Sequence, residues 1–189
     1  LIVAKPTLPF SDKDKMVLDQ YVMNGGKMLW AVETVDAEMD SIFRSGKILA
    51  FPRDLKINDF LFNYGVRLHS TIIKDLNGGK IVLADGETAG NVSYNYYTWP
   101  YFQLGMTADP NPITDNLDPV LFNFANPIEL LENPNIKQTV LLSTSPQTSM
   151  KPALNYLSLD EVDVENFDEY QMGKIPMAVL LEGNFKSAY

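Results

Sequence analysis

Apolar and polar segments alternate along the first part of the chain in a pattern that predicts two strands separated by a helix. Residues 1–4 are apolar and read as the end of a buried strand, and residues 27–32 form a second apolar run. A strand, a helix and a strand in this order are typical of a parallel unit with a right-handed crossover. We therefore expect Val3 and Leu29 to lie in neighbouring or near-neighbouring parallel strands, with the helix packed on one face of the sheet.

The helix between these two strands has its own start and stop signals. Ser11 and Asp14 have the spacing of a capping box, in which each side chain accepts a hydrogen bond from the backbone N–H group of the other residue. Gly25-Gly26 suits the left-handed turn that ends a helix. The apolar stripe expected on this helix consists of Met16, Val17, Leu18, Tyr21 and Val22.

A second helix is predicted at residues 54–64. Residues 33–52, which precede this helix, show only a weak pattern of apolar and polar positions. This indicates a loop or lid over the carboxyl ends of the strands. Asp54 is placed to cap the helix, and Gly65 is placed to end it. Its apolar positions fall at i, i+3, i+4 and i+7, and they are Ile57, Phe60, Leu61 and Tyr64.

The rest of the chain reads as extended. Strands are predicted at residues 66–73 and 80–84, separated by the turn signal Asn77-Gly78-Gly79. Further extended segments, divided by Pro and Asn, are expected at 94–106, 119–124, 137–143 and 175–181.

The order of these elements predicts the domain organisation. We expect one domain over residues 1–189, with an α/β part at 1–88 and a β-rich part at 89–189. Because residue 1 already belongs to a strand and no signal sequence precedes it, we interpret the chain as a fragment excised from a longer protein.

Composition and charge limit the possible partners and chemistry. The 189 residues contain 24 acidic and 15 basic side chains, and the formal charge of −9 disfavours nucleic acid and anionic membrane surfaces as partners. The absence of cysteine excludes disulfides, thiolate nucleophiles and Cys-ligated metals. His69 is the only histidine, so a two-His metal site is excluded and any Ser-His-Asp triad would need this residue. We expect no metal and no cofactor.

The densest aromatic cluster of the sequence lies between residues 94 and 102. Strand alternation would place Tyr97, Trp99 and Tyr101 on one face, and Tyr96 on the other. Pro100 favours an edge strand or a bend, where aromatic rings are accessible to a ligand. We therefore expect at least two of Tyr96, Tyr97, Trp99 and Tyr101 to be exposed and to form a ligand- or partner-binding surface. Packing of these rings in the core is the alternative.

Other polar residues offer weaker candidates for chemistry. If the protein were a hydrolase, its catalytic residues would be His69 or the acids that follow predicted strand ends, namely Asp36, Asp85 and Glu87. The acidic stretch at Asp160, Glu161, Asp163, Glu165, Asp168 and Glu169 lacks the glycine of a calcium loop and reads as a solvated face.

The sequence also resembles a known family. The segment from Phe10 to Trp30 resembles the S-x-x-[DE]-K…L-D-Q-Y…G-G-K-x-L segment of the GldG-type auxiliary proteins of gliding-motility ABC transporters. Similar blocks follow in the same order and cover nearly the whole chain: residues 61–67, 99–102, 112–117, 139–145 and 179–185.

The resemblance implies both a fold and a role. The fold implied is a three-layer α/β sheet of the class I glutamine amidotransferase-like (flavodoxin-like) type, without the Cys nucleophile of those amidotransferases. The role implied is that of a non-catalytic, substrate-binding-like auxiliary component in the periplasm, anchored to the inner membrane by segments outside this chain. Its expected partners are the permease and ATPase subunits of an ABC-2-type transporter. A glycan- or peptide-binding module is the alternative function.

Overall fold

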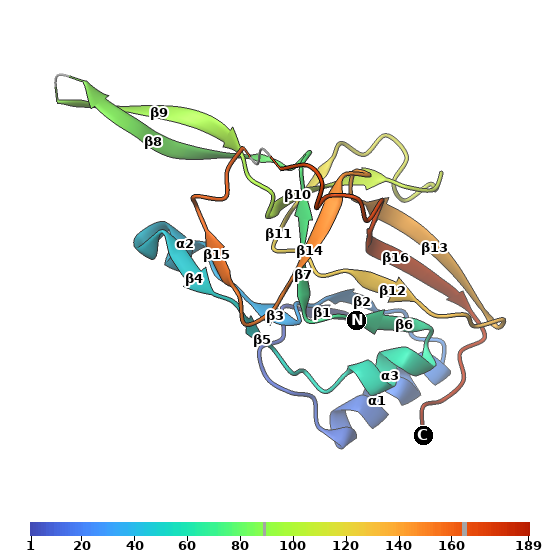
Figure 1. Cartoon of the computed structure of the whole chain (residues 1–189). Coiled ribbons are helices and arrows are strands. Elements are labelled where there is room, and N and C mark those ends of the chain that lie inside the picture. The colour runs from blue at the N-terminus through green and yellow to red at the C-terminus, as the bar shows by residue number, and fades with distance from the viewer. Residues whose placement is uncertain (89, 164–165) are drawn as a thin grey trace.

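The computed structural model describes residues 1–88, 90–163 and 166–189, in which short helices are interspersed with many strands (Figure 1). The helices are α1 (Asp12–Met23), α2 (Met39–Ser45) and α3 (Asn58–Asn63). The strands of the first half are β1 (Ile2–Ala4), β2 (Leu29–Ala31), β3 (Val35–Asp36), β4 (Lys47–Leu49), β5 (Phe51–Pro52), β6 (Val66–Leu68), β7 (Thr71–Asp75) and β8 (Lys80–Thr88). Those of the second half are β9 (Asn91–Thr98), β10 (Phe102–Thr107), β11 (Val120–Asn123), β12 (Ile128–Leu130), β13 (Ile136–Ser143), β14 (Thr148–Pro152), β15 (Tyr156–Ser158) and β16 (Pro176–Gly183). The mixed α/β class and the β-rich second half are confirmed.

The predicted strand–helix–strand unit is present at the N-terminus. β1 and β2 pair in parallel, with Ile2 opposite Leu29 and Val3 opposite Trp30. The capping box of α1 is formed in both directions between Ser11 and Asp14. The expected burial of the two strands is wrong for one face of the pair, because Ile2 and Leu29 are largely exposed whereas Trp30 packs inward.

Helices α1 and α3 lie side by side and share one core. Phe60, Leu61 and Tyr64 of the α3 region are buried against Leu18 and Val22 of α1, as their spacing predicts. The rest of the predicted α1 stripe is less buried, since Met16, Val17 and Tyr21 remain exposed.

The predicted cap of the second helix is wrong. The Asp54 carboxylate accepts a hydrogen bond from the Lys56 N–H group, 2.9 Å away, in the loop before the helix. α3 begins only at Asn58, and Ile57 occupies its N-cap without a side-chain hydrogen bond. An Asx turn and an N-cap use the same side-chain oxygen, so sequence alone does not separate them.

Residues 33–52 do not form the expected loop. They contain β3, α2, β4 and β5, and Ile42 on α2 is fully buried in a second core. β3 pairs with β5, and β4 pairs with the distant β15. Strands of two or three residues have too few positions to show alternation, so the partner strand rather than local pattern defines them.

The predicted strand at residues 66–73 is divided into β6 and β7. β6 pairs with β12 and β7 pairs with β14, both antiparallel. The turn signal at Asn77-Gly78-Gly79 does not join a hairpin either, because β8 pairs with β9 rather than with β7.

The largest sheet of the described residues has four antiparallel strands in the order β11-β10-β13-β16. Their extended conformation was predicted for all four segments. Among the described strands, β1 and β2 form the one parallel pair. The strand pairing therefore supports a mixed α/β fold, and a three-layer flavodoxin-like sheet stays a prediction.

Candidate functional site

The most prominent surface feature is the long hairpin formed by β8 and β9, which projects from the body of the molecule (Figure 1). The two strands pair antiparallel from Lys80 opposite Thr98 to Thr88 opposite Asn91, with an irregularity between Ala84 and Glu87. In the described part of the chain, neither strand pairs with any other strand. Both edges of the hairpin therefore keep backbone groups that no neighbouring strand satisfies.

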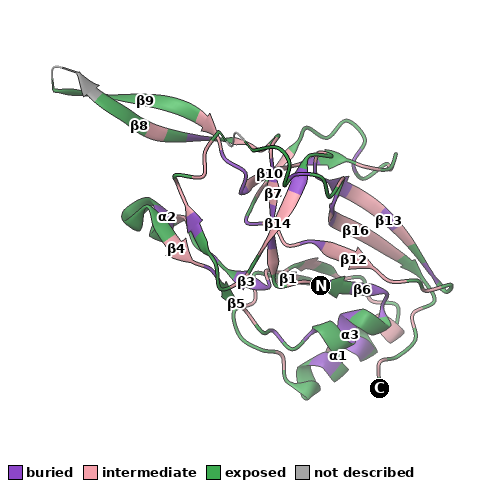
Figure 2. Ribbon diagram, viewed as in Figure 1, coloured by how far each residue is buried: buried purple, intermediate pink, exposed green. Residues whose placement is uncertain are grey.

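One face of this hairpin is apolar and aromatic. Alternation places Tyr94 and Tyr96 on the same face, and the register sets Ala84 and Val82 directly opposite them. Tyr94 is 64% exposed and Tyr96 is 71% exposed. Figure 2 shows most of the hairpin as exposed. We call the side chains of Val82, Ala84, Val92, Tyr94 and Tyr96 the hairpin face.

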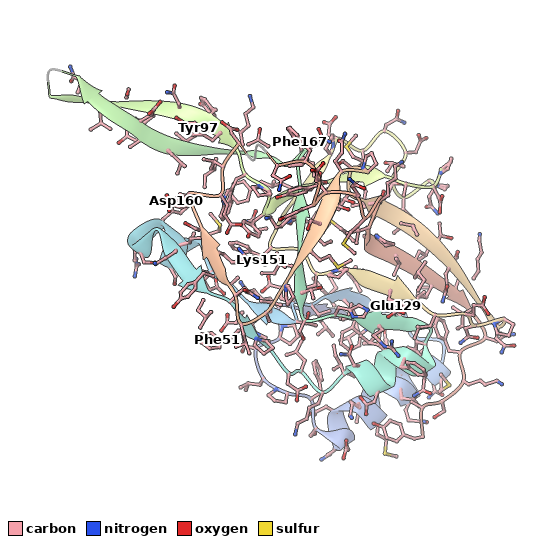
Figure 3. The ribbon with its side chains drawn as sticks, viewed as in Figure 1. Phe51, Tyr97, Glu129, Lys151, Asp160 and Phe167 are labelled. Carbon is pink, nitrogen blue, oxygen red and sulfur yellow. The ribbon has the colours of Figure 1, made fainter. Side chains whose placement is uncertain are left out.

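The opposite face of the hairpin carries Asp85 and Asn95 in its outer part, and apolar and aromatic side chains anchor it to the core at its base. Asn95 donates a hydrogen bond to Asp85 Oδ2 at 2.6 Å, and this bond lowers the pKa of Asp85. A hydrogen bond to Asp85 raises the pKa of Tyr97. Tyr97 and its cross-strand partner Ile81 pack into the core, and Figure 3 places Tyr97 where the hairpin meets the body. Tyr97 is thus half-buried and joins the hairpin to the domain.

The expectation that at least two of Tyr96, Tyr97, Trp99 and Tyr101 are exposed is wrong. Tyr96 is exposed and Tyr97 is half-buried, whereas the rings of Trp99 and Tyr101 are completely buried. Trp99 donates from Nε1 to the Ser158 carbonyl at 3.0 Å and packs edge-on against Tyr101 and Phe124. The strand alternation stops at Thr98, where the chain turns: the Phe102 N–H group donates to the Trp99 carbonyl. Pro100 lies inside this turn and directs both rings into the core. The binding role expected for Tyr96 and Tyr97 stays a prediction.

His69 lies in an exposed ion cluster. Its Nε2 atom is 2.7 Å from Glu129 Oε2, and Arg67 Nη1 is 3.3 Å from the same oxygen. Glu129 is on β12 and Arg67 on the paired strand β6 (Figure 3 labels Glu129). The sequence did not reveal this acid, because the two strands are about sixty residues apart. The ring contacts a carboxylate, and the structure shows no hydroxyl nucleophile bonded to it within the described residues.

The strand-end acids are not brought together. Asp36 lies in β3 and binds Arg53 Nη2 at 2.6 Å, whereas Asp85 lies within the hairpin. The side chain of Glu87 is outside what the structure describes. Asp36 and Asp85 therefore lie on different two-stranded sheets and offer no common site to the hydrolase alternative.

The solvated-face interpretation of the acidic stretch is wrong for Glu161. Its carboxylate accepts hydrogen bonds from Lys151 Nζ at 2.8 Å and from the Tyr101 hydroxyl at 2.8 Å. These bonds and the neighbouring Lys74 lower the pKa of Glu161 although its burial acts to raise it. Asp163 accepts a hydrogen bond from the Thr98 N–H group at the hairpin base, and Glu165 lies outside the described residues. The stretch therefore fastens its loop to the core and to the hairpin.

Within residues 1–88, 90–163 and 166–189, no helix combines the length and the apolar character needed to cross a membrane.

Comparison with known proteins supports a single assignment. Neither the curated proteins nor the solved structures contain a match to this chain. A family model described as an ABC-type uncharacterized transport system matches residues 1–189, which is the whole chain. The protein is therefore a member of this family, whose name denotes an auxiliary component of an ABC-type transport system.

Proposed function

We propose that this chain is a non-catalytic, extracytoplasmic domain of its ABC-type transport system and that it acts by binding a protein subunit through the hairpin face. Membership of an auxiliary transport family supports transporter subunits as partners. The single observation that carries the binding role is the uncovered face of Val82, Ala84, Val92, Tyr94 and Tyr96 on a projecting hairpin.

The physical character of the hairpin favours a protein as the occupant. A two-stranded hairpin is only marginally stable in water, and a covered face and a paired edge both stabilise it. Tyrosine is enriched at protein interfaces because its ring is apolar and its hydroxyl remains hydrogen-bonded. A partner strand added to a free edge would supply main-chain hydrogen bonds, and the two tyrosines would supply side-chain contacts.

The negative charge of the chain limits the chemical character of the proposed partner. The formal charge of the chain is −9. A subunit with an apolar patch and basic residues around it is complementary to this surface, whereas an anionic lipid headgroup is not.

The finer parts of the proposal rest on the resemblance to GldG-type proteins. That resemblance supports a periplasmic position, anchoring to the inner membrane by segments outside this chain, and an ABC-2-type permease with its ATPase as partners. It also supports the three-layer amidotransferase-like scaffold, and the parallel pairing of β1 and β2 is consistent with it.

A glycan- or peptide-binding module is a second candidate function, favoured by one observation. Tyr94 and Tyr96 stand two positions apart on the same face, about 7 Å along the strand, which forms a small platform of two aromatic rings. A neutral sugar ring could stack on such a platform without opposing the negative charge of the domain.

Co-purification with the transporter tests the proposal. We expect the double variant Tyr94→Ser, Tyr96→Ser to bind the permease and ATPase subunits in detergent with an affinity lower by about tenfold or more. The reason is that central interface tyrosines each contribute about 2 kcal/mol to binding. Tyr156→Ser is a matched control, since Tyr156 is 59% exposed on a different strand, β15. Unchanged association of the double variant would contradict the protein-binding role. Selective loss of oligosaccharide binding in the same variant would favour the second candidate instead.

A further inference from the structure

The edge of β9 that faces away from β8, here called the β9 edge, is free along most of its length. At its base, the Thr98 N–H group donates to Asp163 Oδ1 at 3.1 Å, and the Thr98 carbonyl accepts from the Asp163 N–H group at 3.1 Å. Both backbone groups of a residue in an antiparallel strand point to the same edge, and this edge alternates from one residue to the next. The backbone groups of Val92, Tyr94 and Tyr96 therefore point to the same edge as those of Thr98. No described strand or loop pairs with them there.

The β9 edge also lacks the charges that commonly protect an exposed strand. Asn91–Thr98 contains no charged residue, whereas β8 contains Lys80, Asp85 and Glu87. Charged side chains on an edge strand, especially lysines, oppose its pairing with another chain. The β9 edge is therefore suited to pairing with a further uncharged strand.

We propose that the β9 edge pairs antiparallel with the β9 edge of a second copy of this chain, so that two hairpins form a four-stranded sheet. The register that uses every free residue sets Tyr94 opposite Tyr94 of the second copy and Val92 opposite its Tyr96. Each of these pairs exchanges two main-chain hydrogen bonds, which gives about six in total. A register shifted by two residues toward the base would set Val92 opposite Thr98, whose backbone groups are already bonded to Asp163.

The side chains of β9 are self-complementary in this register. On the hairpin face, Tyr94 packs beside Tyr94 of the second copy, and aromatic cross-strand pairs of this kind stabilise sheets. On the other face, Ser93 lies opposite Asn95 of the second copy, and both side chains are uncharged and able to hydrogen-bond. The two-fold axis is perpendicular to the sheet and leaves both hairpin faces on the same side. The inference goes beyond the proposed function and does not depend on it.

The antiparallel arrangement also suits two copies that each carry a formal charge of −9. β9 runs from the tip of the hairpin at Asn91 to the body at Thr98 (Figure 1). Antiparallel pairing with its copy places the two bodies at opposite ends of the new sheet, about 25 Å apart along the strands. This distance exceeds the Debye length of about 8 Å at physiological ionic strength, so the repulsion between the bodies is largely screened. A sheet of four strands is also more stable than an isolated hairpin.

Sedimentation equilibrium of the purified protein alone, over a range of concentrations, tests the proposal. We expect a reversible equilibrium between monomer and dimer. Ser93→Lys is expected to raise the dissociation constant of the dimer by about tenfold or more, because it places charges in an uncharged strand pair. Ser93→Ala removes the same hydroxyl, which is bonded to the Asp85 carbonyl, without adding charge, and should raise the constant by less than about threefold. Asn123→Lys places a lysine at an exposed position of another edge strand, β11, and should leave the dimer unchanged.

Disulfide formation tests the register, since the chain contains no cysteine of its own. The proposed pairing sets residue 93 of one copy opposite residue 95 of the other. A mixture of the Ser93→Cys and Asn95→Cys variants should therefore form disulfide-linked dimers under mild oxidation much faster than either variant alone. Equal rates for the mixture and for the separate variants would contradict the antiparallel register.

Three further results would overturn the proposal. The first is a protein that remains monomeric at every concentration up to its solubility limit. The second is a dimer that Ser93→Lys does not weaken, because its contact would lie elsewhere. The third is a monomeric protein whose association with the transporter subunits is lost in Ser93→Lys, because the β9 edge would then take a strand from a subunit. A dimer that fails to bind the subunits would contradict the proposed function and leave this inference intact.

Discussion

Trp99 and Tyr96 are three residues apart in one aromatic run, yet the structure gives them opposite environments. Trp99 is fully buried and packs against Tyr101, Phe102 and Phe124. Tyr96 points away from the body on the hairpin face. Residue type does not separate the two positions. The turn at Pro100 separates them, because it ends the strand and brings the following rings into the core.

At the residue scale, the two positions predict very different costs of truncation. Trp99→Ala is expected to lower the free energy of unfolding by about 3–5 kcal/mol, because it leaves a large cavity and unpairs the Ser158 carbonyl. Tyr96→Ala is expected to change it by less than about 0.5 kcal/mol. Urea denaturation of both variants measures the difference. Similar losses for the two would show that Tyr96 also belongs to the core.

Among the elements, the β8–β9 hairpin is the most independent. Its strands pair only with each other within the described chain, and its contact with the core is made at its base by Ile81, Leu83 and Tyr97. The stability of the body should therefore depend little on the outer part of the hairpin.

Shortening the hairpin tests this independence. We expect that replacing residues 84–94 with Asn-Gly, which suits a type I′ turn between the paired Leu83 and Asn95, leaves a cooperative unfolding transition within a few degrees of the original. The same variant loses Ala84, Val92 and Tyr94 of the hairpin face and should bind the transporter subunits more weakly. Differential scanning calorimetry measures the first effect. A large drop in melting temperature would mean that the hairpin also stabilises the domain.

For the whole molecule, one buried carboxylate joins segments from the two ends of the described chain. Asp19 on α1 is completely buried and accepts hydrogen bonds from the Ser187 hydroxyl at 2.6 Å, the Ala188 N–H group at 2.9 Å and the Tyr64 hydroxyl at 3.0 Å. Burial alone would raise the pKa of Asp19, but these hydrogen bonds outweigh it and hold the pKa below its ordinary value. The ionised form is thus the one that stabilises the fold.

This linkage predicts a pH dependence with a definite sign. Because the folded-state pKa of Asp19 is below the unfolded one of about 4, its stabilisation is fully present above that value and is lost as the pH falls through the folded-state pKa. Asp19→Asn should lower the free energy of unfolding by about 1–3 kcal/mol at pH 7, and the difference should shrink in acid. Urea titrations across this pH range measure it, with the exposed Asp109→Asn as control. A difference that stays constant in acid would contradict the role of the ionised carboxylate.

The sequence by itself determined those features that depend on neighbouring residues. The S-x-x-D signal of Ser11 and Asp14 placed the start of α1, and the spacing of Phe60, Leu61 and Tyr64 predicted the buried face of α3. The β1–α1–β2 order predicted a parallel pair. Such signals are readable because capping and helical periodicity act over a few residues. Membership of the ABC-type transport family also follows from the sequence alone, because the family model matches residues 1–189.

Tertiary structure alone decided the features that depend on residues far apart in the chain. The short strands β4 and β15 exist only as a pair. The acidic residue Glu161 became part of a half-buried ion cluster only because Lys74, Tyr101 and Lys151 surround it. Tyr94 and Tyr96 became a surface because no described strand covers the hairpin. The physical reason is that burial and ion pairing depend on contacts between segments that are distant in the sequence. A local pattern of apolar and polar residues contains little information about those contacts.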